Sequence, residues 1–265
     1  MEAKVETVDL TIGKEELEAI FRLKHGEPET VGWRPRLSYY YGYFTPDEYY
    51  EALVAKLVQE GQAWLDVGGG RDLFPHNRSL AELLSKRSGW VVGVDPDDTL
   101  DENAYIHYKI KSSIEEYCEE RTFPLVTLRM VAEHIAQPQR AAAALSRLTA
   151  PGGRVVIYTI NRWSPLSWLA RFIPFRFHHA IKHYFWGTEE KDTFPVVYKM
   201  NSRRRLAQIF NAAGFRECSF EYLSDCRTFG RFRSLFCLEL FIWRALKLLG
   251  LHYPENCLLG VYERI

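Results

Sequence analysis

Residues 63–72 have the sequence Ala-Trp-Leu-Asp-Val-Gly-Gly-Gly-Arg-Asp, in which a short apolar run ends in a carboxylate and three glycines. The run is typical of a buried parallel strand, and the glycines are typical of a tight loop that a ligand can approach closely. Residues 90–95, Trp-Val-Val-Gly-Val-Asp, repeat the pattern and deliver Asp95 to the end of a second strand. Because ligands of open α/β sheets bind at the carboxyl edge, Asp66 and Asp95 are predicted to lie beside one ligand.

Two classes of cofactor suit this layout. A dinucleotide requires N–H groups and a helix N-terminus for its pyrophosphate, and its fingerprint is G-x-G-x-x-G. Here Leu73 replaces the third glycine, and the carboxylates of Asp66 and Asp72 are poorly placed beside phosphate. S-adenosylmethionine carries no phosphate. Asp66 suits its ammonium side, and Asp95 suits its ribose, whose two hydroxyls it can accept together.

The two motifs together resemble the class I methyltransferases that use S-adenosylmethionine, over residues 47–160 well and 201–222 loosely. The resemblance implies methyl transfer and an α/β fold with a doubly wound, mostly parallel seven-stranded sheet. It implies no particular acceptor. It also implies contacts with the cofactor for one set of residues, which are Asp66, Gly68, Gly69, Gly70, Asp95, Pro96, Ser113, Ile114, Arg129, Met130 and Tyr43. Tyr43 belongs to a tyrosine cluster that either covers the cofactor as a lid or packs the next helix down.

Periodicity and breaker residues predict the elements of one domain over 1–265. The predicted strands are 63–67, 90–95, 105–110, 123–128, 154–160, 216–223 and 258–263. The predicted helices are 14–23, 47–60, 80–86, 137–149, 203–213 and 234–251. Thr45 and Pro46 are expected to begin the second helix, and 26–36 is expected to be loop. Residues 1–46 are predicted to form a lid segment, with insertions on the substrate side at 161–200 and 224–256.

Composition restricts the partners. The chain has 34 Lys and Arg against 34 Asp and Glu, so no overall positive field attracts nucleic acid. It contains no apolar run of about 18 residues, so no membrane-spanning helix is expected. The chain has five cysteines, and none of them shows C-x-x-C or zinc-ligand spacing, so no metal site is predicted. The N-terminus is charged and lacks a signal-peptide pattern, so the cysteines are expected to be reduced thiols in the cytoplasm.

Three histidines are candidates for a general base, because histidine titrates near neutral pH. His134 follows the fourth predicted strand in a segment that resembles the family's Glu-His ending, where such a histidine often serves the cofactor wall instead. His179 and His183 lie in the first insertion, four residues apart and so on one face of a helix. Packing among aromatic side chains is the alternative role for each. Asp192 is expected to be a solvated loop acid.

The predicted helix 234–251 gathers Glu239, Arg244 and Lys247 in one arc of its wheel and is otherwise nearly all apolar. It could pack against the first insertion, lie in the headgroup region of a membrane through 227–251, or form a homodimer interface. The aromatic insertions favour a small acceptor that is apolar, aromatic or lipid-like, and a role in secondary metabolism. O-methylation is favoured over N- or C-methylation.

Two other functions stay open. An NAD-dependent oxidoreductase is disfavoured by the absent third glycine and the two carboxylates. A non-catalytic binding or interaction module would keep the fold without turnover. Retention of Asp66, the three glycines and Asp95 argues for cofactor binding but not for catalysis, because fold and function separate readily.

Overall fold

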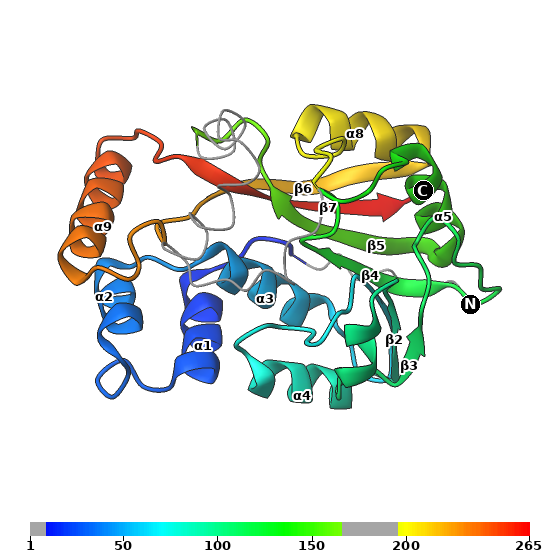
Figure 1. Ribbon diagram of the computed structural model, residues 1–265, viewed down its shortest axis with the longest axis horizontal. Coiled ribbons are helices and arrows are strands. Elements are labelled where there is room, and N and C mark those ends of the chain that lie inside the picture. The colour runs from blue at the N-terminus through cyan, green and yellow to red at the C-terminus, as the bar shows by residue number, and fades with distance from the viewer. Residues whose placement is uncertain (1–8, 166–195) are drawn as a thin grey trace.

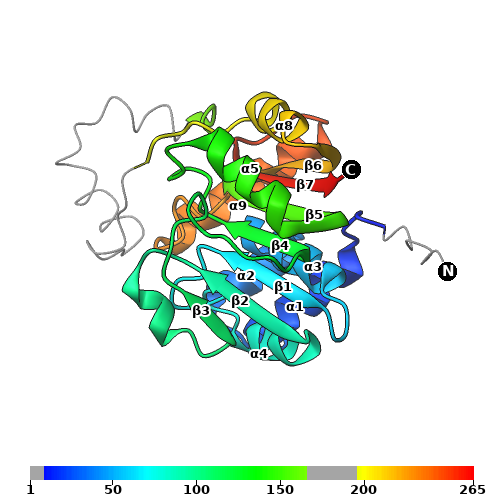
Figure 2. The ribbon, with the colours of Figure 1, turned by 90° about the vertical axis from the view of Figure 1, so that its right-hand side faces the viewer.

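The computed structural model describes residues 9–165 and 196–265. A seven-stranded sheet with the order β3-β2-β1-β4-β5-β7-β6 lies between two layers of helices (Figures 1 and 2). This confirms the predicted doubly wound α/β fold. The strands, with the labels of Figure 1, are β1 (Ala63–Val67), β2 (Trp90–Val94), β3 (Tyr108–Ile110), β4 (Phe123–Arg129), β5 (Thr149–Ile160), β6 (Phe215–Ser224) and β7 (Glu255–Arg264).

The strand directions bring several chain segments to one edge of the sheet. β1 to β5 are parallel, whereas β7 is antiparallel to both β5 and β6, a point that the sequence leaves open. Ile160 at the end of β5 pairs with Cys257 near the start of β7, which in turn pairs with Leu223. The ends of β1, β2, β4, β5 and β6 and the start of β7 therefore share the carboxyl edge.

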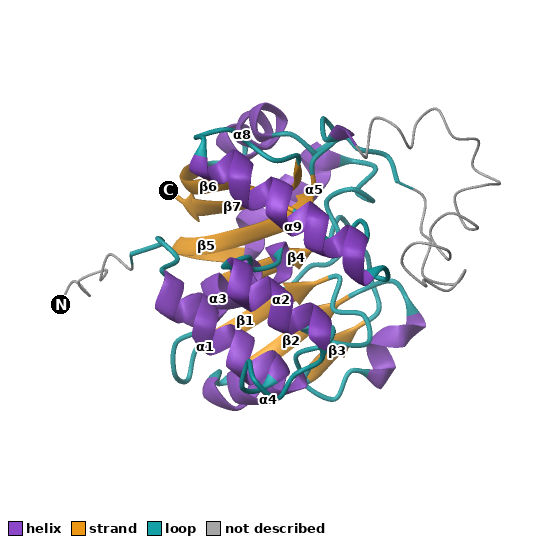
Figure 3. Ribbon diagram, turned by 90° about the vertical axis from the view of Figure 1, so that its left-hand side faces the viewer, coloured by secondary structure: helices purple, strands orange, loops and turns teal. Residues whose placement is uncertain are grey.

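Helices cover both faces of the sheet. They are α1 (Lys14–His25), α2 (Trp33–Tyr41), α3 (Pro46–Leu57), α4 (Arg78–Arg87), α5 (Pro138–Leu148), α8 (Arg203–Ala212) and α9 (Arg233–Leu248), with a 3-10 helix, η1 (Asp98–Glu102). α1, α2, α3 and α9 lie in front of the sheet in Figure 3, and α5 lies in front of it in Figure 2. Neighbouring strand residues alternate between the layers: Trp64 joins the core beneath α1, α3 and α4, and Leu65 joins that beneath α5 and α8.

The start of α3 follows the sequence prediction. Thr45 is the N-cap and Pro46 the first helical residue. Glu48 N donates to Thr45 Oγ1 at 3.3 Å, and Thr45 N donates to Glu48 Oε2 at 2.6 Å. This reciprocal capping box satisfies two backbone donors that have no partner within the helix, so it fixes where α3 begins.

The prediction of loop over 26–36 was wrong in its second half, because α2 begins at Trp33. Pro35 falls in the first turn, where a helix tolerates a missing N–H, so it does not prevent helix formation. Gly42, with φ of 70°, ends the helix in the left-handed conformation. The tyrosine cluster at 39–41 is therefore helical. β3 is also shorter than predicted, with three residues instead of six.

Across residues 9–165 and 196–265, no helix is both long and apolar enough to cross a membrane. In the same ranges no three His, Cys, Asp or Glu side chains gather closely enough to hold a metal ion.

Candidate active site

The first two glycines of the loop after β1 lie close against neighbouring side chains. Gly68 has φ of +76°, and a Cβ there would lie 2.0 Å from Val131 Cγ2. A Cβ on Gly69 would lie 2.7 Å from Ile106 Cδ1. Gly70 N donates to Asp95 Oδ2 at 3.0 Å, which ties the loop to the end of β2. A side chain at either of these glycines would therefore force Val131 or Ile106 to move, and the structure brings the loop and Asp95 together.

Asn103 holds the same loop from the other side. Its Nδ2 donates to Gly69 O at 2.8 Å and to Gly70 O at 3.2 Å, and the residue is fully buried. These bonds turn the loop carbonyls toward Asn103, away from any ligand on the opposite side. Sequence analysis missed Asn103 because it follows η1 without a motif. The one available signal was its position between the second and third predicted strands, which predicts that it lies near the carboxyl edge of the sheet.

Asp66 is a buried carboxylate at the end of β1, only 4% exposed. Thr127 Oγ1 donates to Asp66 Oδ1 at 2.6 Å and accepts from Trp64 Nε1 at 2.8 Å, so the threonine hydroxyl is fixed in one orientation. Burial raises the pKa of Asp66 to about 7, although the Thr127 hydrogen bond and Arg129 oppose the shift. A buried carboxyl with a raised pKa is stabilised as an anion by a cationic ligand group, which fits an ammonium.

Asp95 is partly buried at the end of β2, beside the exposed Pro96. Its Oδ1 accepts from Asp97 N at 2.8 Å, and its Oδ2 accepts from Gly70 N. A carboxylate has about four acceptor positions, so both oxygens can accept further hydrogen bonds, as a diol would require.

Ser113 and Ile114 follow β3. Ser113 is partly buried, and its carbonyl accepts from Glu116 N and Tyr117 N in a turn. Ile114 is 4% exposed and packs in the core beneath α5 and α8. Contact of either residue with an adenine stays a prediction.

Arg129 and Met130 leave β4 at the carboxyl edge. Arg129 Nη2 donates to Asp47 Oδ1 at 2.7 Å, which joins β4 to the first turn of α3. Met130 has φ of +54°, and its N–H donates to Tyr158 O at 2.8 Å. A positive φ is uncommon for a side chain of this size, and such strain concentrates at functional sites.

Four side chains of alternating charge form a row of ion pairs that starts at Arg129 and continues through Asp47 and Arg227 to Asp225. Asp47 also accepts from Arg227 Nη1 at 2.5 Å, and Arg227 binds Asp225 through two bonds of 2.7 Å. Burial raises the pKa of Asp47, but Arg227 and Arg129 outweigh burial and hold that pKa below its ordinary value. The two arginines and two carboxylates thus balance, and they link α3, β4 and the segment before α9.

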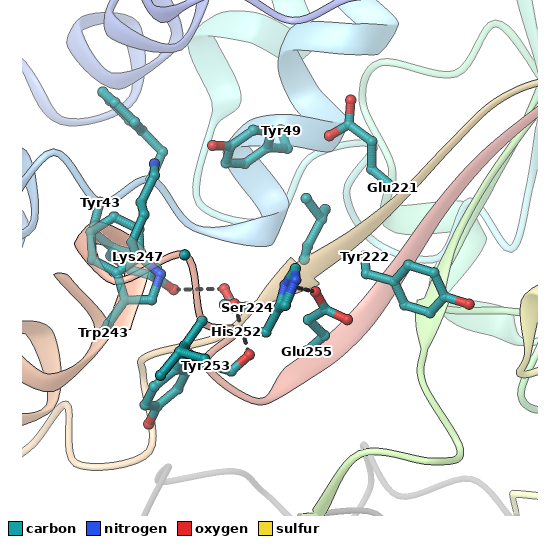
Figure 4. A pocket seen from close by; sticks show the side chains of 14 residues that line it. Tyr43, Tyr49, Glu221, Tyr222, Ser224, Trp243, Lys247, His252, Tyr253 and Glu255 are labelled. Carbon is teal, nitrogen blue, oxygen red and sulfur yellow. Dashed lines mark hydrogen bonds and ion pairs between the residues drawn. The ribbon is translucent and has the colours of Figure 1, made fainter. Parts of the chain in front are cut away.

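Two of the cavities at this end of the sheet are large enough to take part of an acceptor. The first, named here the Asn256 cavity, has a volume of 140 Å³. Its lining residues are Met130, Tyr158, Ile160, Asp225, Arg227, Thr228, Asn256 and Cys257. The second, the Trp243 cavity, has a volume of 390 Å³ and lies between α9, β6 and the start of α3 (Figure 4). Its wall contains aromatic side chains, including Tyr43, Tyr49, Trp243 and Tyr253, together with charged and polar ones. His252 pairs with Glu255 at 2.9 Å.

Tyr43 lies on the Trp243 cavity and not beside the glycine loop. It is 1% exposed, its ring contacts Trp243 edge-on at 5.2 Å, and its hydroxyl accepts from Cys226 N at 2.8 Å. These contacts are those of a packed core residue. Its role as a lid over the cofactor stays a prediction.

The structure places one of the three candidate bases. His134 is partly buried and follows Glu133, whose Oε2 accepts from Thr159 Oγ1 at 2.7 Å. Burial raises the pKa of Glu133, and its contact with β5 holds the loop that carries His134. His179 and His183 lie outside the described residues, as does Asp192. The assignment of a base therefore stays a prediction.

Comparison with known proteins identifies a family. The sequence model of a family described as "Methyltransferase domain" matches residues 41–218. Similar curated proteins include "Ubiquinone biosynthesis O-methyltransferase" of Alkalilimnicola ehrlichii, 34% identical over 42% of this chain and 46% of that protein. The mitochondrial protein of the same name from Arabidopsis thaliana is 35% identical over 39% of this chain and 34% of its own length. The chain therefore spans less than half of these relatives.

Solved structures show the same fold at low identity. The N-methyltransferase NodS from Bradyrhizobium japonicum in complex with S-adenosylhomocysteine has a TM-score of 0.50 at 13% identity, covering 95% of this chain and 97% of that one. A chain of the Haloferax volcanii complex between the Trm112 methyltransferase activator and a methyltransferase has a TM-score of 0.51 at 14% identity, covering 96% and 99%.

Proposed function

The chain belongs to the class I methyltransferases, which use S-adenosylmethionine, and from this premise we propose that it methylates a hydroxyl of a small apolar or lipid-like acceptor. The observation that carries the proposal is the meeting of Asp66, the glycine loop and Asp95 at one sheet edge. O-methylation is further supported by the names of the curated relatives. The aromatic Trp243 cavity beside that edge supports an apolar acceptor.

The residues present fit this cofactor. In the proposed site the Asp66 carboxylate holds the ammonium, and Asp95 accepts the ribose hydroxyls. S-adenosylmethionine supplies an electrophilic methyl group, whose bond to sulfur breaks as a bond to the acceptor oxygen forms. The hydroxyl proton passes to a base, for which His134, His179 and His183 are the candidates. Alignment of the acceptor oxygen is then the main task of the protein.

A dinucleotide fits less well. Residues 68–77 separate β1 from α4, so α4 does not begin directly after the glycines, as a helix that binds a pyrophosphate does in the dinucleotide fold. The N-cap of α4 is Asn77, whose Nδ2 donates to Glu51 Oε2 at 2.8 Å on α3. A pyrophosphate at the loop would lack the helix N-terminus and would meet Asp66 and Asp95 instead. The alternative of an NAD-dependent oxidoreductase therefore gains no support.

We further propose that α9 and its flanks touch a membrane surface. Glu239 faces inward, 3% exposed, and accepts from Phe229 N at 3.2 Å and from the Tyr253 hydroxyl at 2.9 Å. Arg244 and Lys247 are exposed, so the outward charges of the helix are cationic. Eight large apolar side chains here are more than one third exposed, namely Phe232, Leu235, Leu238, Phe241, Ile242, Leu248, Leu249 and Leu251. Exposed apolar and cationic groups together suit anionic lipid.

The remaining parts of the proposal concern organisation. Residues 1–46 would act as a lid segment, and 161–200 and 224–256 would form the substrate side of a single domain. A cytoplasmic location and a role in secondary metabolism belong to the same proposal. A homodimer through α9 competes with membrane contact for the same exposed face.

Calorimetric titration tests the cofactor. S-adenosylhomocysteine is expected to bind with micromolar affinity and NAD is expected not to bind. Binding of NAD alone would overturn the proposal. Turnover then separates an enzyme from a binding module: methyl transfer from labelled S-adenosylmethionine to alkylated phenols is expected, and cofactor binding without transfer to any acceptor would favour the module.

Vesicle flotation tests the membrane surface. The chain is expected to float with phosphatidylglycerol vesicles more than with phosphatidylcholine vesicles, and Leu238→Glu is expected to reduce flotation. Leu83→Glu is the matched control, because Leu83 is 42% exposed on α4, far from α9 in sequence. Flotation that is equal for Leu238→Glu and Leu83→Glu would remove the proposal. A dimer that Leu238→Glu dissociates would assign the face to a second copy instead.

A further inference from the structure

Asn256 carries a buried polar atom that has no partner among residues 9–165 and 196–265. The residue is 8% exposed, and its Oδ1 makes no hydrogen bond within those ranges. Its Nδ2 donates to Asp225 O at 3.4 Å, and its backbone carbonyl accepts from Asn161 N at 2.8 Å. The donor to Asp225 O has to be the amide nitrogen, so the free atom is an acceptor. Buried acceptors in native proteins nearly always have a partner, so this one indicates the position of a bound donor.

The Asn256 cavity lies where the acceptor of a methyl group is required. Met130 follows β4, Ile160 ends β5, and both line the cavity, so it opens at the carboxyl edge of the central strands. Its volume is 140 Å³. A protein cavity of about 150 Å³ binds one benzene molecule, so this space holds one six-membered ring.

One wall of the cavity is apolar and the other is polar. The apolar wall consists of Met130, Ile160, the Tyr158 ring and Cys257. Burial raises the pKa of Tyr158 well above its ordinary value and that of Cys257 to about 12, so both are uncharged near neutral pH. The polar wall combines Asn256 with Asp225, Arg227 and Thr228.

Arg227 adds donors without adding net charge. Three of its five N–H groups bind Asp225 and Asp47. The other two make no hydrogen bond within the described part of the chain and can donate to a ligand oxygen. Because Asp47 and Asp225 balance Arg227 and Arg129, the polar wall suits a neutral oxygen better than a strongly anionic group.

We propose that the Asn256 cavity binds a single uncharged ring bearing a hydroxyl, which donates to Asn256 Oδ1 and accepts from Arg227. The inference rests on the proposed function and specifies the polar end of its acceptor. Asn256 and Arg227 are positioning residues: an amide and a paired guanidinium take no proton, but they fix the direction in which the hydroxyl oxygen points.

The test compares two ring probes in the full chain saturated with S-adenosylhomocysteine. 4-Methylphenol carries the hydroxyl donor, and 4-methylanisole replaces it with a methoxy group of similar shape. In the unaltered chain 4-methylphenol is expected to bind about tenfold more tightly, the value of one buried hydrogen bond. Asn256→Leu is expected to reduce this ratio toward one. Asn256→Asp keeps an acceptor oxygen and is expected to keep the preference.

The controls separate the possible failures. Asn211→Leu makes the same chemical change at an exposed position on α8 and is expected to leave the ratio unchanged. Affinity for S-adenosylhomocysteine reports that each variant is folded. A ratio that Asn256→Leu leaves intact overturns the inference, as does a chain that binds S-adenosylhomocysteine but neither probe, while the proposed function survives both. A chain that does not bind S-adenosylhomocysteine removes the proposed function and, with it, this inference.

Discussion

Asp66→Asn is expected to stabilise the cofactor-free protein more strongly at pH 8 than at pH 5. Burial raises the pKa of Asp66 from 3.8 to about 7, so between these values the folded chain keeps a proton that the unfolded chain has released. Rising pH therefore favours unfolding up to about pH 7 and has no further effect above it. At about 1.4 kcal/mol per pKa unit, ionising Asp66 lowers the free energy of unfolding by about 3 kcal/mol between pH 5 and 8.

The substitution is nearly isosteric. Asparagine keeps the oxygen that accepts from Thr127 Oγ1, 2.6 Å away, so the hydrogen bond of the threonine survives. Urea unfolding of both chains at pH 5, 6, 7 and 8 gives the difference in free energy of unfolding, in which all other titrating groups cancel. The difference is expected to grow with pH up to 7. A difference independent of pH would refute the argument.

Two controls localise the effect. Asp98→Asn makes the same change on a side chain that is 92% exposed, and its difference from the parent is expected to be small at every pH. Saturating S-adenosylhomocysteine should shrink the pH dependence of the Asp66→Asn difference, because its ammonium stabilises the Asp66 anion. 5′-Methylthioadenosine, which lacks the ammonium, should leave that dependence in place.

Three further predictions concern the glycine loop. In a denaturant titration, Gly68→Ala should lower the free energy of unfolding by about 2–4 kcal/mol, because the backbone is left-handed and the new Cβ clashes with Val131. The control is Gly152→Ala, where φ is +73° and a Cβ would meet no atom within 4 Å. It should lower the free energy of unfolding by only about 1–2 kcal/mol. Asp95→Ala should weaken S-adenosylhomocysteine binding about tenfold or more by calorimetry, and unchanged affinity would exclude the ribose contact. Asn103→Leu should release the loop carbonyls and weaken S-adenosylhomocysteine binding about tenfold. An affinity equal to that of the parent chain would contradict this role of Asn103.

The strands around the proposed cofactor site were predictable because their signals are local. An apolar run that ends in Asp66 or Asp95 marks a buried parallel strand and its carboxyl end within a few residues. The capped start of α3 at Thr45 was predictable for the same reason. α2 was missed because Gly32 and Pro35 are strong breaker signals, although the first turn of a helix accommodates both.

The orientation of α9 depends on packing that no local pattern contains. On a helical wheel of α9 the charged residues fall in one arc, and this pattern predicts that Glu239 lies on the exposed side of the helix. In the structure Glu239 is buried because Phe229 N and the Tyr253 hydroxyl, ten and fourteen residues away, both donate to it. A carboxylate with two such donors can be buried, and part of the apolar surface is left outside.

The proposed acceptor side of the site is assembled from three segments that are far apart in the sequence. Asp47 lies on α3, Arg129 ends β4, and Arg227 precedes α9, yet one carboxylate joins both arginines. Without Asp47 the two partly buried guanidinium groups would keep their like charges and lose their shared partner, so Asp47 holds Arg227 at the Asn256 cavity. Met130 follows Arg129 and lines the same cavity. The ion pair therefore couples the residue expected beside the cofactor to the residue expected beside the acceptor, and no sequence spacing could have indicated it.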